Sequence, residues 1–241
     1  MSCSNRHCPF FKFEADGAKI ADDAIACVVN DCTHVVEFDH GEVLFMQGQP
    51  SSNLFALNEG MVKICSNTAD GREQIVGLSS PSNLLVGLQS LNEDRYAYTA
   101  VAATPVRACR INHHAMLAKV RNDGGVAVRL IEAINAQLAH SRALMEVMGH
   151  RCAASKIAAF ILLMTPKSTN GNGTCNCQVE MPFSRVEMAG LLGLSEETVC
   201  RSMAMMKRMG AVNAPRGRIE IRDWDRLHAI ADECCGGQII N

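Results

Sequence analysis

The chain has 241 residues, of which 48% are hydrophobic and 20% charged, and its formal net charge at pH 7 is −2. This length suits one large domain or two modest ones, and the near-neutral charge excludes a strongly basic protein. No run of about 18 apolar residues exists, which argues against a membrane span, and the first eight residues lack the apolar core of a secretory signal. We therefore expect a cytoplasmic protein whose twelve cysteines are mostly reduced thiols.

The first half of the chain consists of two segments with different sequence patterns. Residues 1–34 form a cysteine-containing N-terminal segment, in which 18–29 fits a short helix. From 35 to 122, short apolar runs such as Val43-Leu44-Phe45 alternate with recurrent glycines. Short strands at this spacing predict a β-sandwich, barrel or roll. Asp70-Gly71, between two strand-like runs, predicts a hairpin turn.

A long helix is predicted over residues 123–149, because apolar residues there recur at alternating spacings of four and three. The stripe comprises Ala127, Ile131, Ile134, Leu138, Ser141, Met145 and Met148. Such a stripe fits a dimerisation helix, and the alternative is an amphipathic helix packed on its own domain. We expect a homodimer, because the stripe is narrow and the helix lies between two domain-like blocks.

Residues 150–241 predict a winged helix-turn-helix domain. A helix over 153–164 ends before Pro166, and a polar loop over 167–177 comes next. Ser184-Arg185-Val186-Glu187 then has the S-x-x-E form of a capping box at the start of a helix. Gly193 allows the tight turn that joins this helix to the next.

The second helix of this pair begins at the cap Ser195 and runs over 196–209, with Gly210 placed to end it. Two short helices joined by a turn with glycine place the second helix in the DNA major groove. Beyond it, two short strands over 211–214 and 218–221 predict the wing.

The start of the second helix has side chains suited to base contact. Glu197, Cys200 and Arg201 fall within about one turn. A carboxylate accepts from the cytosine amino group, and a guanidinium pairs with guanine through two parallel bonds. The alternative is a surface ion pair between Glu197 and Arg201, which the capped turn makes the weaker interpretation. Positive charges for phosphate contact complete the predicted DNA-binding set, which is Ser195, Glu197, Thr198, Cys200, Arg201, Lys207, Arg208 and Arg216.

These motifs resemble the cyclic-AMP receptor/fumarate-nitrate regulator (CRP/FNR) family over roughly 35–227. Gly41-Glu42-Val43-Leu44-Phe45 and the stretch from Gly71 to Gly77 are similar to its β-roll, and Leu194 to Arg201 is similar to its recognition helix. The resemblance implies an α+β fold with a cyclic-nucleotide-binding-like β-roll, a long dimerisation helix and a C-terminal winged helix-turn-helix. It implies a homodimeric transcription regulator that binds double-stranded, FNR-like palindromic DNA, works with RNA polymerase and is not an enzyme.

The resemblance also implies a 4Fe–4S cluster that senses oxygen or nitric oxide. The FNR branch holds its cluster on three N-terminal cysteines and one in the roll, and Cys109 is similar in position to the roll cysteine. Cys3 and Cys8 precede Pro9-Phe10, a pair that resembles the residues after the family's last N-terminal ligand. A cluster takes about four thiolates, so Cys27 completes the candidate set. Buried packing is the alternative for Cys27 and for Cys32.

The sequence also leaves open alternatives to the cluster as the sensor and to a transcription regulator as the class of protein. A haem is the second candidate cofactor, and a small-molecule effector or no cofactor are further alternatives. Cyclic nucleotide is not expected, because the stretch 82–87 lacks the family's acidic residue and neither serine nor threonine follows Arg95. No G-x-S-x-G, H-E-x-x-H or Walker motif favours an enzyme, and the helix-turn-helix argues against a pure interaction module. The candidate haem ligands are His34, His40, His113 and His114.

Overall fold

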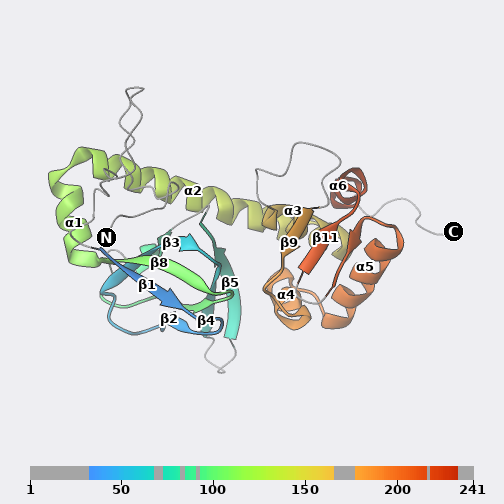
Figure 1. Ribbon diagram of the computed structural model, residues 1–241, viewed down its shortest axis with the longest axis horizontal. Helices are drawn as coiled ribbons and strands as arrows, with labels where there is room; N and C mark the ends of the chain where they lie inside the picture. Colours follow the sequence, from blue (N-terminus) through green and yellow to red (C-terminus); the bar gives the residue numbers. More distant parts are fainter. Residues whose placement is uncertain are drawn as a thin grey trace. The chain divides into compact units, whose positions relative to one another are not determined.

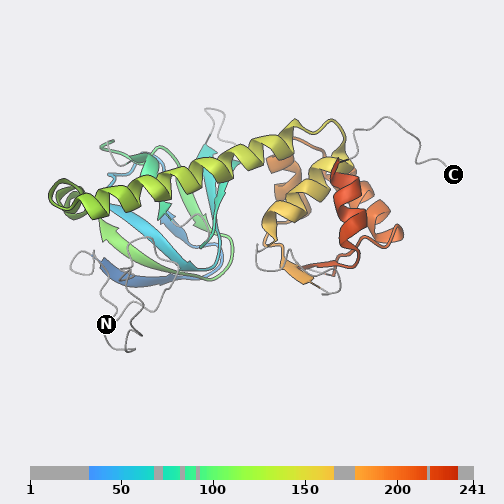
Figure 2. The same ribbon diagram turned by 90° about the horizontal axis from the view of Figure 1, so that it is seen from above.

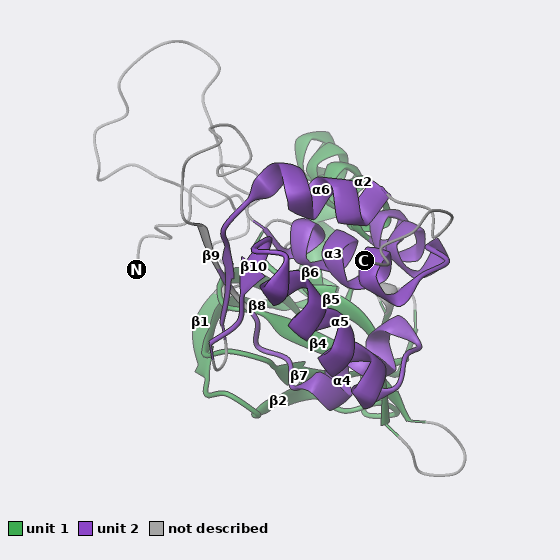
Figure 3. Cartoon of the chain, turned by 90° about the vertical axis from the view of Figure 1, so that its right-hand side faces the viewer, with its two compact units in different colours: residues 1–140 green, residues 141–241 purple. Residues whose placement is uncertain are grey.

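The computed structural model describes residues 33–67, 73–81, 85–90, 93–165, 177–215 and 218–232. They belong to two compact units, residues 1–140 and 141–241, divided within the long helix (Figure 3). The predicted helix over 18–29 and the turn at Asp70-Gly71 lie outside the described residues. Within these ranges, no helix is both long enough and apolar enough to cross a membrane.

Unit 1 is built on two antiparallel four-stranded sheets (Figure 1). One sheet has the order β1-β8-β3-β6, with strands Thr33–Phe38, Val106–Asn112, Asn53–Glu59 and Leu85–Val86. The other has the order β2-β7-β4-β5, with strands Val43–Phe45, Thr99–Ala102, Val62–Asn67 and Glu73–Ser79. A 3-10 turn, η2 (Leu88–Ser90), comes after β6. Strands β4 and β5 pair from Val62 opposite Ser79 to Asn67 opposite Glu73, as the predicted hairpin requires.

The core of unit 1 lies on both faces of the β8-containing sheet. Side chains alternate across a strand, so Ala108 and Cys109 of β8 enter different apolar clusters. The cluster that joins the two sheets is rich in aromatic rings and comprises Phe45, Phe55, Leu57, Val62, Ile64, Val86, Tyr96, Ala100, Ala102, Val106 and Ala108. The β-roll predicted from the short apolar runs is therefore confirmed.

Two helices cover the other face of that sheet. They are α1 (His113–Asn122) and α2 (Gly124–Gly149), and the start of α2 lies along the roll (Figure 2). The Asn112 side chain accepts the Ala115 N–H at 3.0 Å and caps α1. From α2, the buried side chains Val126, Leu130 and Ala133 pack into the cluster with Leu54, Ile111 and Met116.

Helix α1 was not predicted from the sequence. Its ten residues offer two buried side chains, His113 and Met116, so its apolar periodicity is too weak to identify a helix. Tertiary packing on the sheet stabilises this helix, together with the cap at Asn112.

His140 of α2 is partly buried, and its buried Nε2 atom has no hydrogen-bond partner among the described residues. Burial lowers the pKa of His140 below its usual 6.5. The unfolded chain therefore takes up a proton before the folded chain does as the pH falls. This contribution to stability is complete above about pH 6.5 and decreases as the pH falls below it.

We expect the midpoint urea concentration of the protein to decrease when the pH is lowered from 7.5 to 5.5. The midpoint of His140→Gln should decrease less over the same interval. The substituted side chain cannot titrate, so the proton linkage at this position disappears. Unfolding monitored by circular dichroism at both pH values measures the difference. The same pH dependence in both proteins would exclude His140 as the cause.

Unit 2 combines helices with a three-stranded sheet of order β10-β11-β9. The helices are α3 (Ala153–Met164), α4 (Arg185–Leu192), α5 (Glu196–Arg208) and α6 (Trp224–Asp232). The strands are β9 (Cys177–Glu180), β10 (Val212–Asn213) and β11 (Arg218–Ile221). The helix predicted over 153–164 is α3, and the winged helix-turn-helix is confirmed.

Strand β9 corrects the sequence interpretation, which placed Cys177 in a polar loop. Cys177 lies opposite Ile221, and Val179 lies opposite Ile219 in the ladder with β11. The four residues of β9 are half polar and come after an Asn/Gly-rich stretch, so no local pattern distinguishes them. Pairing with β11, about forty residues later, makes them a strand.

The cysteines are not all reduced. Cys65, Cys109 and Cys200 are free thiols among the described residues, as expected for most of the twelve. Cys152 is disulfide-bonded, so it is an exception to the expectation of mostly reduced thiols. Its partner lies outside the side chains that the structure describes.

Candidate nucleic-acid interface and sensor residues

The first helix of the helix-turn-helix begins with a complete capping box. Ser184 Oγ accepts the Glu187 N–H at 3.1 Å, and Glu187 Oε2 accepts the Ser184 N–H at 2.8 Å. Gly193 ends α4 with φ 64°, a left-handed conformation that glycine adopts without steric cost. These local signals set the start and the end of α4 where the sequence predicted them.

The recognition helix α5 is capped by two of the predicted DNA-binding residues. Ser195 Oγ accepts the Thr198 N–H at 3.2 Å and lies 2.8 Å from Thr198 Oγ1. Both side chains are therefore engaged in forming the helix N-terminus. The N–H groups and the positive end of the helix dipole at this position suit a DNA phosphate.

Helix α5 divides into a buried face and an open face. Val199, Met203 and Met206 are buried in unit 2, which fixes the rotation of the helix. The exposed residues on its remaining surface include the predicted base-contacting and phosphate-contacting set Glu197, Cys200, Arg201, Lys207 and Arg208. The sequence thus predicted a group of side chains that the helix presents together.

Glu197 and Arg201 form the surface ion pair that was the weaker alternative to base contact in the sequence. Glu197 Oε1 lies 3.7 Å from Arg201 Nη1, and the two side chains are 79% and 71% exposed. Exposed pairs of this kind contribute about 0–1 kcal/mol. The pair can therefore open at small cost, which leaves both side chains free for base contact.

Cationic side chains from flanking helices hold the C-terminal ends of α4 and α5. Arg226 of α6 donates from Nη1 to the Met209 carbonyl, and Lys156 of α3 donates to the Leu192 carbonyl at 3.4 Å. A cation at this end of a helix is favoured by the helix dipole. Neither contact was predicted from the sequence, because the bonded residues lie 17 and 36 positions apart.

The wing places one further cation beside the predicted contacts. Val212 pairs with Ile221, and Asn213 pairs with Glu220. Residues 216–217 lie outside the described residues, and the predicted contact Arg216 is one of them. Arg218, at the start of β11, is exposed and was not predicted, although its position next to the wing turn was available as a signal.

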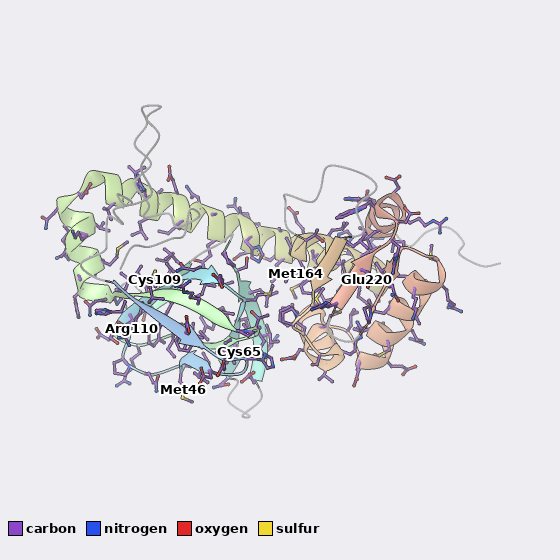
Figure 4. All side chains as sticks on the ribbon, viewed as in Figure 1. Met46, Cys65, Cys109, Arg110, Met164 and Glu220 are labelled. Atoms are coloured by element: carbon purple, nitrogen blue, oxygen red, sulfur yellow. The ribbon has the colours of Figure 1, made fainter. Side chains whose placement is uncertain are left out.

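Cys109, the predicted ligand in the roll, has its thiol in the apolar cluster between the sheet and α1–α2 (Figure 4). Its residue is 5% exposed, and the Asn58 amide donates to its Sγ at 3.6 Å. Among the residues that the structure describes, no group of three or more His, Cys, Asp or Glu could hold a metal ion. Cys109 alone therefore makes no cluster site, and the other candidate ligands, Cys3, Cys8 and Cys27, lie outside the described residues.

The four candidate haem ligands lie on different parts of unit 1. His34 is on β1 opposite Arg110, and His40 Nδ1 lies 2.9 Å from the Ala103 carbonyl. His113 Nδ1 lies 3.0 Å from the Ser51 carbonyl. Its Nε2 is buried without a hydrogen-bond partner among the described residues, whereas His114 is exposed. None of these arrangements singles out an axial ligand.

Aromatic rings pack in the roll next to Arg95, at the position where the family resemblance places the Arg-Ser or Arg-Thr pair of nucleotide-binding members. Arg95 Nη1 donates to the Gly48 carbonyl at 2.6 Å. The next residue, Tyr96, is buried and stacks on Phe45 with ring centroids 3.9 Å apart. Its hydroxyl donates to the Asn53 carbonyl at 2.7 Å and accepts the Asn53 N–H at 3.1 Å. Burial is the main cause that raises the pKa of Tyr96.

We expect Tyr96→Phe to lower the free energy of unfolding by about 1–3 kcal/mol, because the Asn53 N–H and carbonyl lose their buried partner. Tyr98→Phe is the matched control, since Tyr98 is only partly buried against the same cluster. Urea unfolding of both variants measures the difference. Equal, small effects would show that the Tyr96 hydroxyl does not stabilise the roll.

Comparisons with known proteins match both units. Residues 35–123 match the model of the cyclic nucleotide-binding domain, and residues 155–230 match the Crp-like helix-turn-helix domain. The transcriptional activator protein anr of Pseudomonas aeruginosa is 29% identical over 199 residues, which are 83% of this chain and 79% of the relative. The nitrogen fixation regulation protein FixK of Azorhizobium caulinodans is 26% identical over 194 residues, 80% of this chain and 77% of the relative.

The fold also matches solved structures. The structure of FixK2 from Bradyrhizobium japonicum superposes with a TM-score of 0.70 at 22% identity, covering 83% of this chain and 98% of that one. A β-roll, a long helix and a winged helix-turn-helix with an open recognition helix together define a DNA-binding transcription regulator. The two domain models cover more than half of the chain, which belongs to the CRP/FNR family, in its FNR-like branch. The relatives named above are transcription regulators rather than enzymes.

Proposed function

We propose that the protein is a homodimeric transcription activator that acts in the cytoplasm on an FNR-like palindromic DNA site. The observation that carries this proposal is the open face of α5, where Glu197, Cys200 and Arg201 are exposed on a helix whose other face is buried. The carboxylate suits a cytosine amino group and the guanidinium suits guanine. Cys200 suits a thymine methyl, since a thiol is a weak hydrogen-bond donor. RNA polymerase is the expected partner of an activator.

The dimer is supported by the unpartnered stripe on α2. Its large apolar side chains are 41–60% exposed and comprise Ile131, Ile134, Leu138, Met145 and Met148. The adjacent face of the same helix packs on the sheet through Val126, Leu130 and Ala133. A heptad stripe left exposed beside a buried face is suited to a second copy of the helix. A two-fold dimer presents two α5 helices, which matches a palindromic site.

Selection of bound sequences from a random duplex pool tests this function. We expect enrichment of a two-fold symmetric site, and fluorescence anisotropy with that site should show two chains per duplex. Affinity should fall steeply with salt, because Lys207 and Arg208 release counterions on binding phosphates. Recovery of no common sequence would refute the proposed function.

For the signal, we propose oxygen or nitric oxide acting through a 4Fe–4S cluster on Cys3, Cys8, Cys27 and Cys109. In its support, β1, the first strand after the N-terminal cysteines in the sequence, pairs with β8 so that Val35 lies opposite Cys109. The burial of Cys109 among apolar side chains weighs against the proposal, since the packing there must open to admit a cluster. Aromatic packing beside Arg95 supports the expectation that cyclic nucleotide is not the effector.

Anaerobic purification with absorption spectra and iron and sulfide analysis tests the cluster. About four irons per chain, with a visible band that bleaches in air, would support it. Single serine substitutions at the four cysteines should then each lower the iron content. A colourless, iron-free protein would refute the cluster, and a Soret band after haem addition would favour the haem alternative. An effector screen by thermal shift is the next experiment if both are negative.

A further inference from the structure

Ala204 is exposed on α5 and belongs to none of the contacts predicted from the sequence. It comes seven residues after Glu197, so the helical period places it within about 20° of Glu197 around the axis. Cys200 lies about 40° to one side of Ala204, and Arg201 lies about 60° to the other. Ala204 is therefore at the centre of the open face, with the proposed base contacts around it.

The buried face of α5 lies on the opposite side of the helix from Ala204. Met206 is 0% exposed and is two residues later, about 200° around the axis. The other buried side chains, Val199 and Met203, lie within about 60° of Met206. Their packing in unit 2 fixes the rotation of α5, so the methyl group of Ala204 is directed away from unit 2.

An alanine at the centre of the open face suits the floor of the DNA major groove. The groove is about 12 Å wide, and an α-helix with its side chains is about 10–12 Å across, so little room is left in front of an inserted helix. Alanine projects only a methyl group, which has no hydrogen-bond donor or acceptor. The group on a base edge that matches such a side chain is the 5-methyl group of thymine.

The position of Ala204 along α5 separates this contact from the one proposed for Cys200. Four residues of helix rise about 6 Å, which is nearly twice the spacing of about 3.4 Å between successive base pairs. Ala204 and Cys200 are therefore expected to contact different base pairs.

We propose that the Ala204 methyl group packs on the 5-methyl group of one thymine in each half-site and thereby specifies thymine at that position. This contact rests on the DNA-binding function proposed above, and it adds an apolar contact to the polar ones of Glu197 and Arg201. Burial of one methyl group changes affinity by about threefold to fourfold, so the two half-sites together give a preference of roughly tenfold.

Deoxyuridine in place of thymine tests the contact, because it lacks the 5-methyl group and forms the same base pair. The palindrome selected by the full-length protein is synthesised with each thymine replaced in turn, in both half-sites together. Fluorescence anisotropy should show one position at which the wild-type protein loses roughly tenfold in affinity and Ala204→Gly loses nothing. The two duplexes are compared within each protein, so the lower helix propensity of glycine affects both measurements equally.

Ala204→Leu is the second variant, because leucine keeps a high helix propensity. We expect it to bind the unmodified palindrome about tenfold or more weakly, since the longer side chain holds α5 away from the bases that Glu197 and Arg201 contact. Ala229→Leu is the matched control. Ala229 is exposed on α6, outside the helix-turn-helix, and its variant should bind like the wild-type protein.

The same deoxyuridine pattern in the wild-type protein and in Ala204→Gly would overturn the thymine contact. Unchanged binding of the palindrome by Ala204→Leu would overturn it as well. Both results require a selected palindrome, so they are distinct from the recovery of no common sequence, which overturns the proposed function and this contact with it.

Discussion

Arg201→Ala is expected to abolish sequence-specific DNA binding while leaving the fold intact. The side chain is 71% exposed and forms an exposed surface pair with Glu197, so its removal costs little stability. Loss of a bidentate contact to guanine costs about 1–3 kcal/mol in each half-site, and a dimer loses it twice. Fluorescence anisotropy with the selected palindrome and with a scrambled duplex measures the loss of specificity.

Two matched variants separate base contact from general charge. Arg201→Lys keeps the charge but lacks the planar fork, so it should resemble Arg201→Ala in specificity. Arg208→Ala removes an exposed cation from the last turn of α5, and should weaken binding to both duplexes by a similar factor. Unchanged discrimination in Arg201→Ala, at an unchanged melting temperature, would contradict the assignment. It would also revive the interpretation of the chain as an interaction module.

The parts of the fold that were predicted from the sequence depend on short-range chemistry. The capping box at Ser184, the left-handed Gly193 and the cap at Ser195 act within about one helical turn, so a local pattern suffices to identify them. The exposed face of α5 can be derived from the 3.6-residue period once those ends are fixed. The exposed residues of α5 that we propose as base contacts could therefore be predicted as a group.

The parts that were not predicted depend on partners distant in the chain. Strand β9 exists through its ladder with β11, and the end of α5 is held by Arg226 from another helix. The contact between Ser155 and the Ile230 carbonyl, which brings α3 to the end of α6, joins segments 75 residues apart. A sequence pattern contains no record of such juxtapositions.

Leu138→Glu is expected to convert the dimer into a monomer and to weaken binding to the palindrome by about two orders of magnitude or more. Leu138 is 44% exposed in the middle of the α2 stripe. In a parallel, two-fold pair of helices this position faces its own copy, so the substitution places two carboxylates together at an apolar seam. A monomer binds one half-site and loses the gain in effective concentration from the second recognition helix.

Ala136→Glu is the control that makes this result specific to the stripe. Ala136 is exposed on the same helix, and it lies about 200° around the axis from Leu138. The same charge there should leave the dimer and its DNA affinity unchanged. Sedimentation velocity at micromolar concentration distinguishes the two species, and circular dichroism checks that α2 is intact. A Leu138→Glu protein that stays dimeric would show that the stripe packs within its own chain. The binding of two half-sites would then have to come from a different dimer interface.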